Sequence, residues 1–266
     1  MRIALCQMTV VDNKNTNLET ASRMIKEASS KGADIVVLPE MFNCPYSNEH
    51  FHKYAEKENG YTFSQLSEWA AEHGLIIVGG SIPEKSGAHV YNTSFVFNSN
   101  GQCLGKHRKA HLFDIDVPGG ITFKESETLT AGNTSTVIDT EFGKMGLAIC
   151  YDIRFPELFR KMVLEGAQFI IVPAAFNMTT GPAHWELTAR ARALDNQVFM
   201  ALCSPARDDD GLYKAYGHTL VTSPWGDVIA ALKESEGLLM VDIELEKEDE
   251  VRRNLPLLKH RKPEMY

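Results

Sequence analysis

Cys150 is the residue whose position best suits a nucleophile. It ends the uncharged apolar segment 145–149 and is followed at once by a helix start with Asp152 and Pro156. A thiol there projects from a strand end, while the N–H groups of the helix start favour the thiolate and can bind an oxyanion. Free cysteines are also common as small buried apolar residues, so position alone leaves both roles open for Cys150.

Glu40 is the acidic group placed for the same chemistry. It follows the apolar segment 35–38 by two residues, so we expect its carboxylate at the carboxyl end of a strand, where ligands of parallel sheets bind. A glutamate there can act as a general base. The alternative is a solvated loop carboxylate, which is what we expect of its neighbours Glu49, Glu56 and Glu58.

Lys109 lies in a concentrated basic segment, 106–111, of an otherwise acidic protein. If this segment is a strand, His107, Lys109 and His111 share one face. A metal site from the two histidines is disfavoured, because it needs helical spacing and the adjacent cations repel a metal ion. An ammonium group that stabilises an anionic tetrahedral intermediate is the simpler role for Lys109, and a solvated basic strand edge is the alternative.

The elements that must position these groups alternate along the chain. Short apolar runs followed by amphipathic segments are typical of an α/β sheet covered by helices. Thr62 and Gln65 have the spacing of a capping box at a helix start. We expect strands at 3–8, 35–38, 75–78, 91–97 and 103–109, and helices at 17–31, 62–73 and 244–254.

Two segments of the chain resemble each other, which bears on domain organisation. Residues 32–40 and 166–174 are similar, and each follows an amphipathic helix. This indicates two β-α-β units that face each other in a pseudo-symmetric pair of sheets. No low-complexity linker divides the chain, so we predict a single domain over residues 1–266.

Composition excludes several classes of protein. Apolar residues make up 44% and charged residues 23% of the 266 residues, which is the soluble globular range. The formal charge of -8 provides no basic field, so we expect neither nucleic acid nor membrane as a partner. The five cysteines form no C-x-x-C pair, which argues against a disulfide framework or a zinc ribbon and indicates a cytoplasmic protein.

Three segments of this sequence, taken together, resemble a known family. Residues 38–40, 108–113 and 149–157 are similar, in order and spacing, to the three signatures of the nitrilase (carbon-nitrogen hydrolase) superfamily. The resemblance implies a four-layer α-β-β-α sandwich and a Glu-Lys-Cys triad on Glu40, Lys109 and Cys150. It also implies a homodimer or larger homo-oligomer, with the segment after Cys150 and the tail 255–266 as candidate interface elements.

Further segments, 112–119, 121–126 and 179–187, are most similar to the omega-amidase branch of that superfamily. The resemblance implies that Glu125 is a second active-site glutamate, for which an ordinary loop charge is the alternative. It implies that Arg154 and Thr180 hold a substrate carboxylate and that the Tyr151 N–H binds the oxyanion. A structural ion pair is the alternative for Arg154.

The function implied is the hydrolysis of a terminal amide through a cysteine thioester, with release of ammonia and with no metal or organic cofactor. Short dicarboxylic monoamides such as 2-oxoglutaramate and 2-oxosuccinamate are the expected substrates. A second hypothesis keeps the fold and triad but takes deaminated glutathione, an N-carbamoyl amine or a nitrile. A third is a binding protein without turnover, which ammonia release would exclude.

Overall fold

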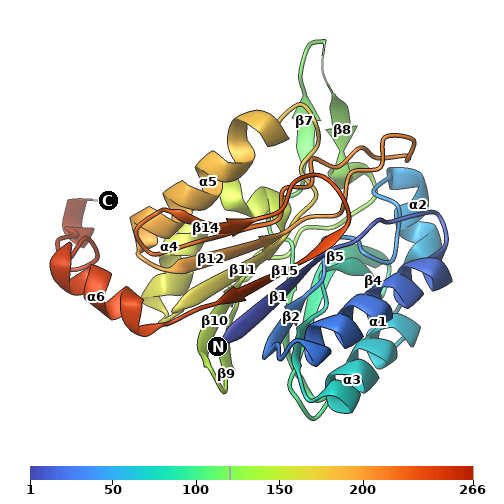
Figure 1. The fold of residues 1–266 in the computed structure, drawn as a ribbon. Coiled ribbons are helices and arrows are strands. Elements are labelled where there is room, and N and C mark those ends of the chain that lie inside the picture. The colour runs from blue at the N-terminus through green and yellow to red at the C-terminus, as the bar shows by residue number, and fades with distance from the viewer. Residues whose placement is uncertain (120, 266) are drawn as a thin grey trace.

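Two β-sheets lie face to face with helices on their outer faces in the computed structural model, which describes residues 1–119 and 121–265 (Figure 1). The first sheet has the order β15-β1-β2-β3-β5-β4, with β6 paired to β5. Its strands are β1 (Arg2–Gln7), β2 (Ile35–Val37), β3 (Ile76–Val78), β4 (Ile82–Ser86), β5 (His89–Phe97), β6 (Cys103–Arg108) and β15 (Gly237–Asp242).

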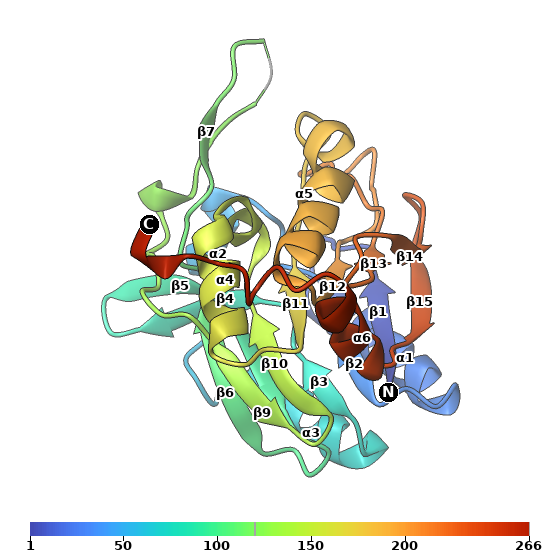
Figure 2. The same cartoon turned by 90° about the vertical axis from the view of Figure 1, so that its left-hand side faces the viewer.

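The second sheet has the order β14-β13-β12-β11-β10-β9. Its strands are β9 (Val137–Thr140), β10 (Gly143–Leu147), β11 (Phe169–Pro173), β12 (Phe199–Cys203), β13 (Leu220–Thr222) and β14 (Val228–Ala231). A separate hairpin of β7 (Asp114–Asp116) and β8 (Thr122–Lys124) projects from the body of the molecule (Figure 2).

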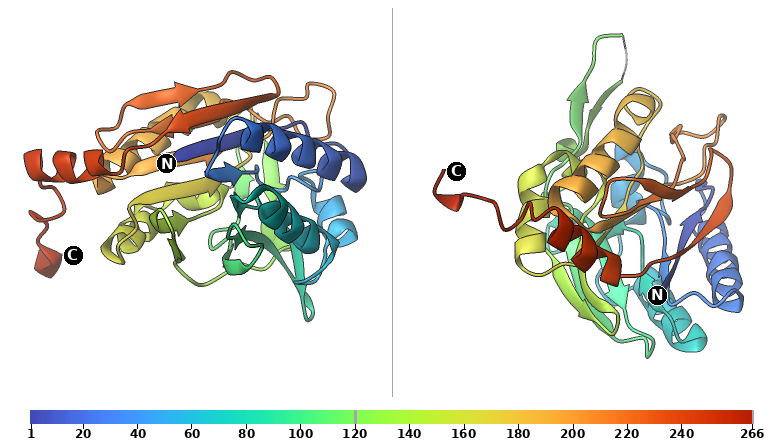
Figure 3. Two further views of the ribbon diagram at one scale, coloured as in Figure 1. Left: turned by 60° about the horizontal axis from the view of Figure 1, so that its bottom comes forward. Right: turned by 60° about the vertical axis from the view of Figure 1, so that its left-hand side comes forward.

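Helices complete the four layers (Figure 3). α1 (Lys14–Ser30) and α3 (Tyr61–His73) pack on the first sheet, and α4 (Pro156–Leu164) and α5 (Gly181–Asn196) pack on the second. The remaining helices are α2 (Asn48–Tyr54) and α6 (Glu246–Asn254), with short 3₁₀ helices η1 (Glu125–Glu127), η2 (Cys150–Arg154) and η3 (Pro263–Met265). The predicted α-β-β-α sandwich is therefore confirmed.

Alternation along the buried strands explains why the layers form. In β1, Ile3 and Leu5 belong to the core between the sheets, whereas Ala4 and Cys6 face the helices. Because both faces are covered, such a strand reads as a continuous apolar run. Cys6 is thus a core residue.

The two resembling segments occupy equivalent places. β1 pairs in parallel with β2 across α1, and β10 pairs in parallel with β11 across α4. The predicted pair of β-α-β units is confirmed. The first sheet is completed only by the C-terminal strand β15, which pairs antiparallel with β1 from Arg2↔Asp242 to Gln7↔Gly237.

The predicted capping box at Thr62 is wrong. Gly60 is the N-cap of α3, and Thr62 lies inside the helix with its hydroxyl 2.6 Å and its N–H 2.7 Å from the Glu56 carboxylate. Glu56 also pairs with Lys14 at 2.7 Å, so it is not a solvated loop carboxylate either. A negative charge at a helix N-terminus satisfies the free N–H groups from outside the helix.

No helix in residues 1–119 and 121–265 has the length and apolar character needed to cross a membrane. At the C-terminus, the segment after α6 extends away from the body (Figures 1 and 3). Residue 266, the last of the predicted interface tail, lies outside the described residues.

Gly80 holds the end of β2 against the end of β3. Its φ is +54°, and a Cβ at this position would lie 2.1 Å from the Pro39 carbonyl oxygen. The Leu38 N–H donates to the Val78 carbonyl at 3.0 Å on the same side. This close approach fixes the segment that carries Glu40.

We predict that Gly80→Ala lowers the free energy of unfolding by about 1 to 3 kcal/mol more than Gly87→Ala. Gly87 has a similar φ of +61° but no atom within 4 Å of an added Cβ, so it carries only the backbone cost of roughly 1 kcal/mol. Urea unfolding of both variants measures the difference. Equal losses would show that the contact with Pro39 does not constrain the β2 end.

Candidate active site

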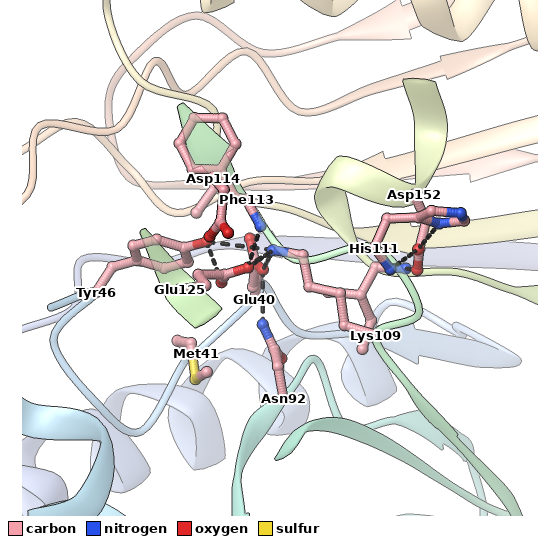
Figure 4. A network of polar contacts seen from close by, with 12 residues as sticks. Glu40, Met41, Tyr46, Asn92, Lys109, His111, Phe113, Asp114, Glu125 and Asp152 are labelled. Atoms are coloured by element: carbon pink, nitrogen blue, oxygen red, sulfur yellow. Dashed lines mark hydrogen bonds and ion pairs between the residues drawn. The ribbon is translucent and has the colours of Figure 1, made fainter. Parts of the chain in front are cut away.

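Four of the predicted site residues meet at the carboxyl ends of strands from the two sheets and from the β7-β8 hairpin. Glu40 comes three residues after β2, Lys109 directly after β6, and Cys150 three residues after β10. Glu125 begins η1, directly after β8. Figure 4 shows Glu40, Lys109 and Glu125 converging from these separate segments.

Lys109 is the centre of this cluster. Its ammonium nitrogen lies 2.9 Å from Glu40 Oε1, 2.9 Å from Glu125 Oε2 and 3.3 Å from the Tyr46 hydroxyl (Figure 4). Lys109 and Glu125 are 0% exposed and Glu40 is 1% exposed. The alternatives of solvated surface charges are therefore wrong for all three residues.

Neighbouring polar groups fix the two carboxylates. Asn92 donates to Glu40 Oε1 at 2.8 Å, while Glu40 Oε2 has no hydrogen-bond partner among the described residues. Glu125 accepts from the Tyr46 hydroxyl and from the Phe113 N–H, both at 2.6 Å. Sequence reasoning missed Asn92 and Tyr46. Three consecutive buried polar residues, 92–94, in the predicted strand 91–97 were a signal for Asn92, whereas Tyr46 had none.

The turn that carries Cys150 is tied to the segment that carries Lys109. Cys150 has a φ of +45°, which an L-residue adopts only when its surroundings hold it there. Asp152 accepts the Ile149 N–H at 3.0 Å, His107 Nε2 at 3.0 Å and His111 Nδ1 at 2.7 Å. The two histidines thus serve one buried carboxylate that joins the end of β10 to the end of β6.

A small pocket beside Cys150 contains the predicted substrate-binding residues. Cys150, Tyr151, Arg154 and Thr180 line it. Arg154 donates to His184 Nδ1 at 3.2 Å, and its guanidinium lies 5.0 Å from the Phe176 ring centre. Its buried Nε has no hydrogen-bond partner among the described residues, so the contacts that the structure gives Arg154 are with a histidine and aromatic rings and not with a carboxylate.

Comparison with known proteins identifies the family. The family described as carbon-nitrogen hydrolase matches residues 2–253. The chain belongs to the carbon-nitrogen hydrolase family. Omega-amidase NIT2 of Xenopus tropicalis is 51% identical to this hydrolase over 265 residues, which cover 100% of this chain and 96% of that protein.

Two further relatives agree with this assignment. Omega-amidase NIT2 of Homo sapiens is 47% identical over 265 residues, covering 100% of this chain and 96% of that protein. The crystal structure of Saccharomyces cerevisiae Nit3, described as a member of branch 10 of the nitrilase superfamily, superposes with a TM-score of 0.91 at 41% identity. It covers 98% of this chain and 96% of that one.

Burial and charge set the ionisation of the hydrolase's cluster. Burial raises the pKa of Glu40, and Lys109 only partly opposes this. Burial would lower the pKa of Lys109, but Glu125 and Glu40 together raise it well above its ordinary value. Burial and the nearby Glu40 raise the pKa of the Cys150 thiol, so the thiol is neutral at rest and needs a base to become a nucleophile.

We predict that kcat/KM rises with pH through an acidic limb above 4.5, the ordinary pKa of a glutamate. Below that limb Glu40 is protonated and cannot take the thiol proton, and its raised pKa moves the limb upward. Rates of amide hydrolysis from about pH 4 to about pH 8 measure it as an apparent pKa of the coupled cluster. Glu40→Gln should lose at least ~10² in kcat/KM and the limb with it. A wild-type limb at or below 4.5 contradicts the assignment.

Proposed function

We propose that this carbon-nitrogen hydrolase is an omega-amidase, which cleaves the terminal amide of short dicarboxylic monoamides to the acid and ammonia. The observation that carries the proposal is the guanidinium of Arg154, which lines the same small pocket as Cys150 and whose buried Nε has no hydrogen-bond partner among the described residues. A half-buried cation with an unused N–H donor suits a ligand that brings its own carboxylate. Relatives named omega-amidase, about half identical over the full chain, support the same reaction.

In the acylation step, Cys150 Sγ attacks the amide carbon while Glu40 takes the thiol proton. Oε2 of Glu40 suits this task because it has no hydrogen-bond partner, whereas Oε1 is held by Lys109 and Asn92. The C–N bond then breaks, and the proton passes from Glu40 to the leaving nitrogen, which departs as ammonia. The acyl group stays on sulfur as a thioester.

Two groups are proposed to hold the negative oxygen of the tetrahedral intermediate, the Lys109 ammonium and the Tyr151 N–H. A single donor of this kind contributes about 10² to 10³ in rate. Glu125 and Tyr46 hold Lys109 in place through their contacts with its ammonium nitrogen. Glu125 therefore orients the cation rather than touching the reacting carbon.

In the deacylation step, water takes the place of the ammonia. Glu40 accepts a proton from that water as its oxygen attacks the thioester carbon, the C–S bond breaks, and the thiolate regains the proton from Glu40. The free acid leaves and the resting state returns. Arg154, with the Thr180 hydroxyl, is proposed to hold the far carboxylate through both steps.

The second candidate function keeps the same fold and catalytic residues but acts on another C–N substrate. That substrate would be deaminated glutathione, an N-carbamoyl amine or a nitrile. The pocket beside Cys150 is narrow and is walled by aromatic rings such as Phe113 and Phe176. Its size favours a short acyl chain over a peptide-like one.

Self-association and compartment are part of the same proposal. We infer a homodimer or larger homo-oligomer, with the segment after Cys150 and the tail 255–266 as its interface elements. Leu164 at the end of α4 is 55% exposed, and a contact through that segment would cover it. All five cysteines are free, which supports a reducing, cytoplasmic setting.

We predict that Cys150→Ala abolishes turnover while the protein stays folded, because Cys150 is the thiol that interacts with the Glu40 carboxylate. Mass spectrometry of wild type with substrate should trap the acyl group on Cys150. Cys103→Ala, a change at the exposed cysteine, is the control and should keep normal turnover. An adduct on Cys6, Cys44, Cys103 or Cys203 instead would contradict the assignment of Cys150 as the nucleophile.

We predict that Arg154→Lys lowers kcat/KM for 2-oxoglutaramate or 2-oxosuccinamate by roughly tenfold or more, because lysine keeps the charge but loses the paired N–H donors. A neutral amide of similar length should already be a poor substrate and change little. Arg23→Lys, at an exposed ion pair with Glu236, is the matched control. Wild-type hydrolysis of neutral amides as fast as of these monoamides would favour the second candidate.

A further inference from the structure

The loop before β13 pairs with the segment that follows β11. The Tyr216 N–H donates to the Phe176 carbonyl at 2.7 Å, and Asn177 and Ala215 form an antiparallel β-bridge. These contacts lie outside the named strands, so backbone pairing fastens the loop at this point. A side chain on the loop close to this pairing therefore has a fixed place beside the segment after β11.

Tyr213 adds a side-chain bond to this pairing. Its hydroxyl donates to the Ala175 carbonyl at 2.6 Å, and the structure shows no other donor to that carbonyl among the described residues. Ala175 is 3% exposed, so without Tyr213 its carbonyl would be buried and unpaired, which costs free energy. Burial raises the pKa of Tyr213, and Cys150 and Glu40 raise it further, so the hydroxyl stays protonated and remains a donor.

Ala175 connects this bond to the nucleophile. Ala175 and Cys150 line the same small pocket, and a backbone hydrogen bond from Ala175 lowers the pKa of the Cys150 thiol, against the effect of burial. A backbone N–H stabilises a thiolate only while it stays aimed at the sulfur. The Tyr213 hydroxyl holds the carbonyl of the same residue, and it thereby limits the movement of that N–H.

The ring of Tyr213 contacts a residue that holds the cation of the catalytic cluster. Its ring centre lies 4.7 Å from that of Tyr46, with an angle of 38° between the two ring planes. Tyr46 in turn donates to Glu125 at 2.6 Å, and its hydroxyl lies 3.3 Å from the Lys109 ammonium nitrogen. One side chain thus contacts both the segment beside the nucleophile and the tyrosine beside the cation.

We propose that Tyr213 is a positioning residue for the hydrolysis, which acts through Ala175 on the nucleophile and through Tyr46 on the cation. The inference rests on the proposed function, in which a thiolate attacks the amide and an ammonium group holds the oxyanion. Tyr213 is not among the described residues that line the Arg154 pocket. Its effect therefore falls on the chemical steps and not on the binding of the substrate carboxylate.

Tyr213→Phe tests the hydroxyl alone, because it keeps the ring against Tyr46. We expect kcat for 2-oxoglutaramate to fall about fivefold, the scale of one hydrogen bond, while KM stays within about twofold. Tyr216→Phe is the matched control, since it removes from the same loop a hydroxyl that is not bonded to Ala175, and it should keep the wild-type kcat. Tyr213→Leu also removes the ring contact with Tyr46, and it should lose about a further threefold in kcat.

Alkylation of Cys150 by iodoacetamide separates positioning from a general loosening of the fold. The reagent attacks the thiolate, so weaker support from the Ala175 N–H lowers the rate, whereas a looser fold would expose the buried thiol and raise it. We expect the rate at Cys150 to fall about threefold at about pH 8 in Tyr213→Phe and to stay at the wild-type value in Tyr216→Phe. Mass spectrometry resolves each cysteine, and the exposed Cys103 is the internal control, with an unchanged rate.

Three outcomes would overturn the inference. The first is a Tyr213→Phe variant with wild-type kcat and wild-type alkylation of Cys150. The second is a loss confined to KM, which would place Tyr213 in substrate binding. The third is faster alkylation of Cys150 together with the other buried cysteines, which would make the role of the hydroxyl purely structural. A wild type that releases no ammonia from any amide would instead overturn the proposed function, so the two failures are distinguishable.

Discussion

One buried ammonium group, that of Lys109, serves two buried carboxylates, and the rest of the site depends on it. Glu40 and Glu125 lie within 3.0 Å of the same nitrogen, away from water, where an unpaired charge is costly. With both carboxylates ionised and the Cys150 thiol neutral, these three groups and Cys150 together carry one excess negative charge. A proton that moves from Cys150 to Glu40 leaves the total of the four groups unchanged, so the cluster can pass from thiol to thiolate without burying a new net charge.

Each half of the chain supplies an incomplete set of groups. The first sheet delivers Glu40 and Lys109, and the second delivers Cys150. Asp152 joins them, because one carboxylate accepts hydrogen bonds from the turn after β10 and from the histidines beside Lys109. Its pKa lies below the ordinary range despite burial, since His107 and His111 both bond to it. The relative position of the base Glu40 and the nucleophile Cys150 therefore depends on the hydrogen bonds of the Asp152 carboxylate, which is ionised at neutral pH.

The sequence could predict the site residues that lie at the ends of strands. Glu40 and Cys150 each follow an apolar run, Lys109 ends the predicted strand 103–109, and the carboxyl ends of parallel strands collect at one edge of a sheet. Glu125 follows a short hairpin with no apolar signal, so only the family resemblance pointed to it. Helix starts were harder, since the group that caps α3 is a carboxylate from the preceding loop and not the Thr62 hydroxyl. Local patterns also cannot reveal that β1 pairs with β15, about 240 residues away in the chain.

The pairing of β1 with β15 has a consequence for how the chain is made. β1 is synthesised well before β15, with which it pairs from Arg2↔Asp242 to Gln7↔Gly237. Until Gly237 to Asp242 has been synthesised, one edge of β1 presents unpaired N–H and C=O groups and an apolar strand to its surroundings. Edges of that kind pair readily with other chains. The nascent protein therefore passes through a long interval in which it is open to aggregation and to capture by chaperones, and that interval closes only when the last strand of the sheet docks.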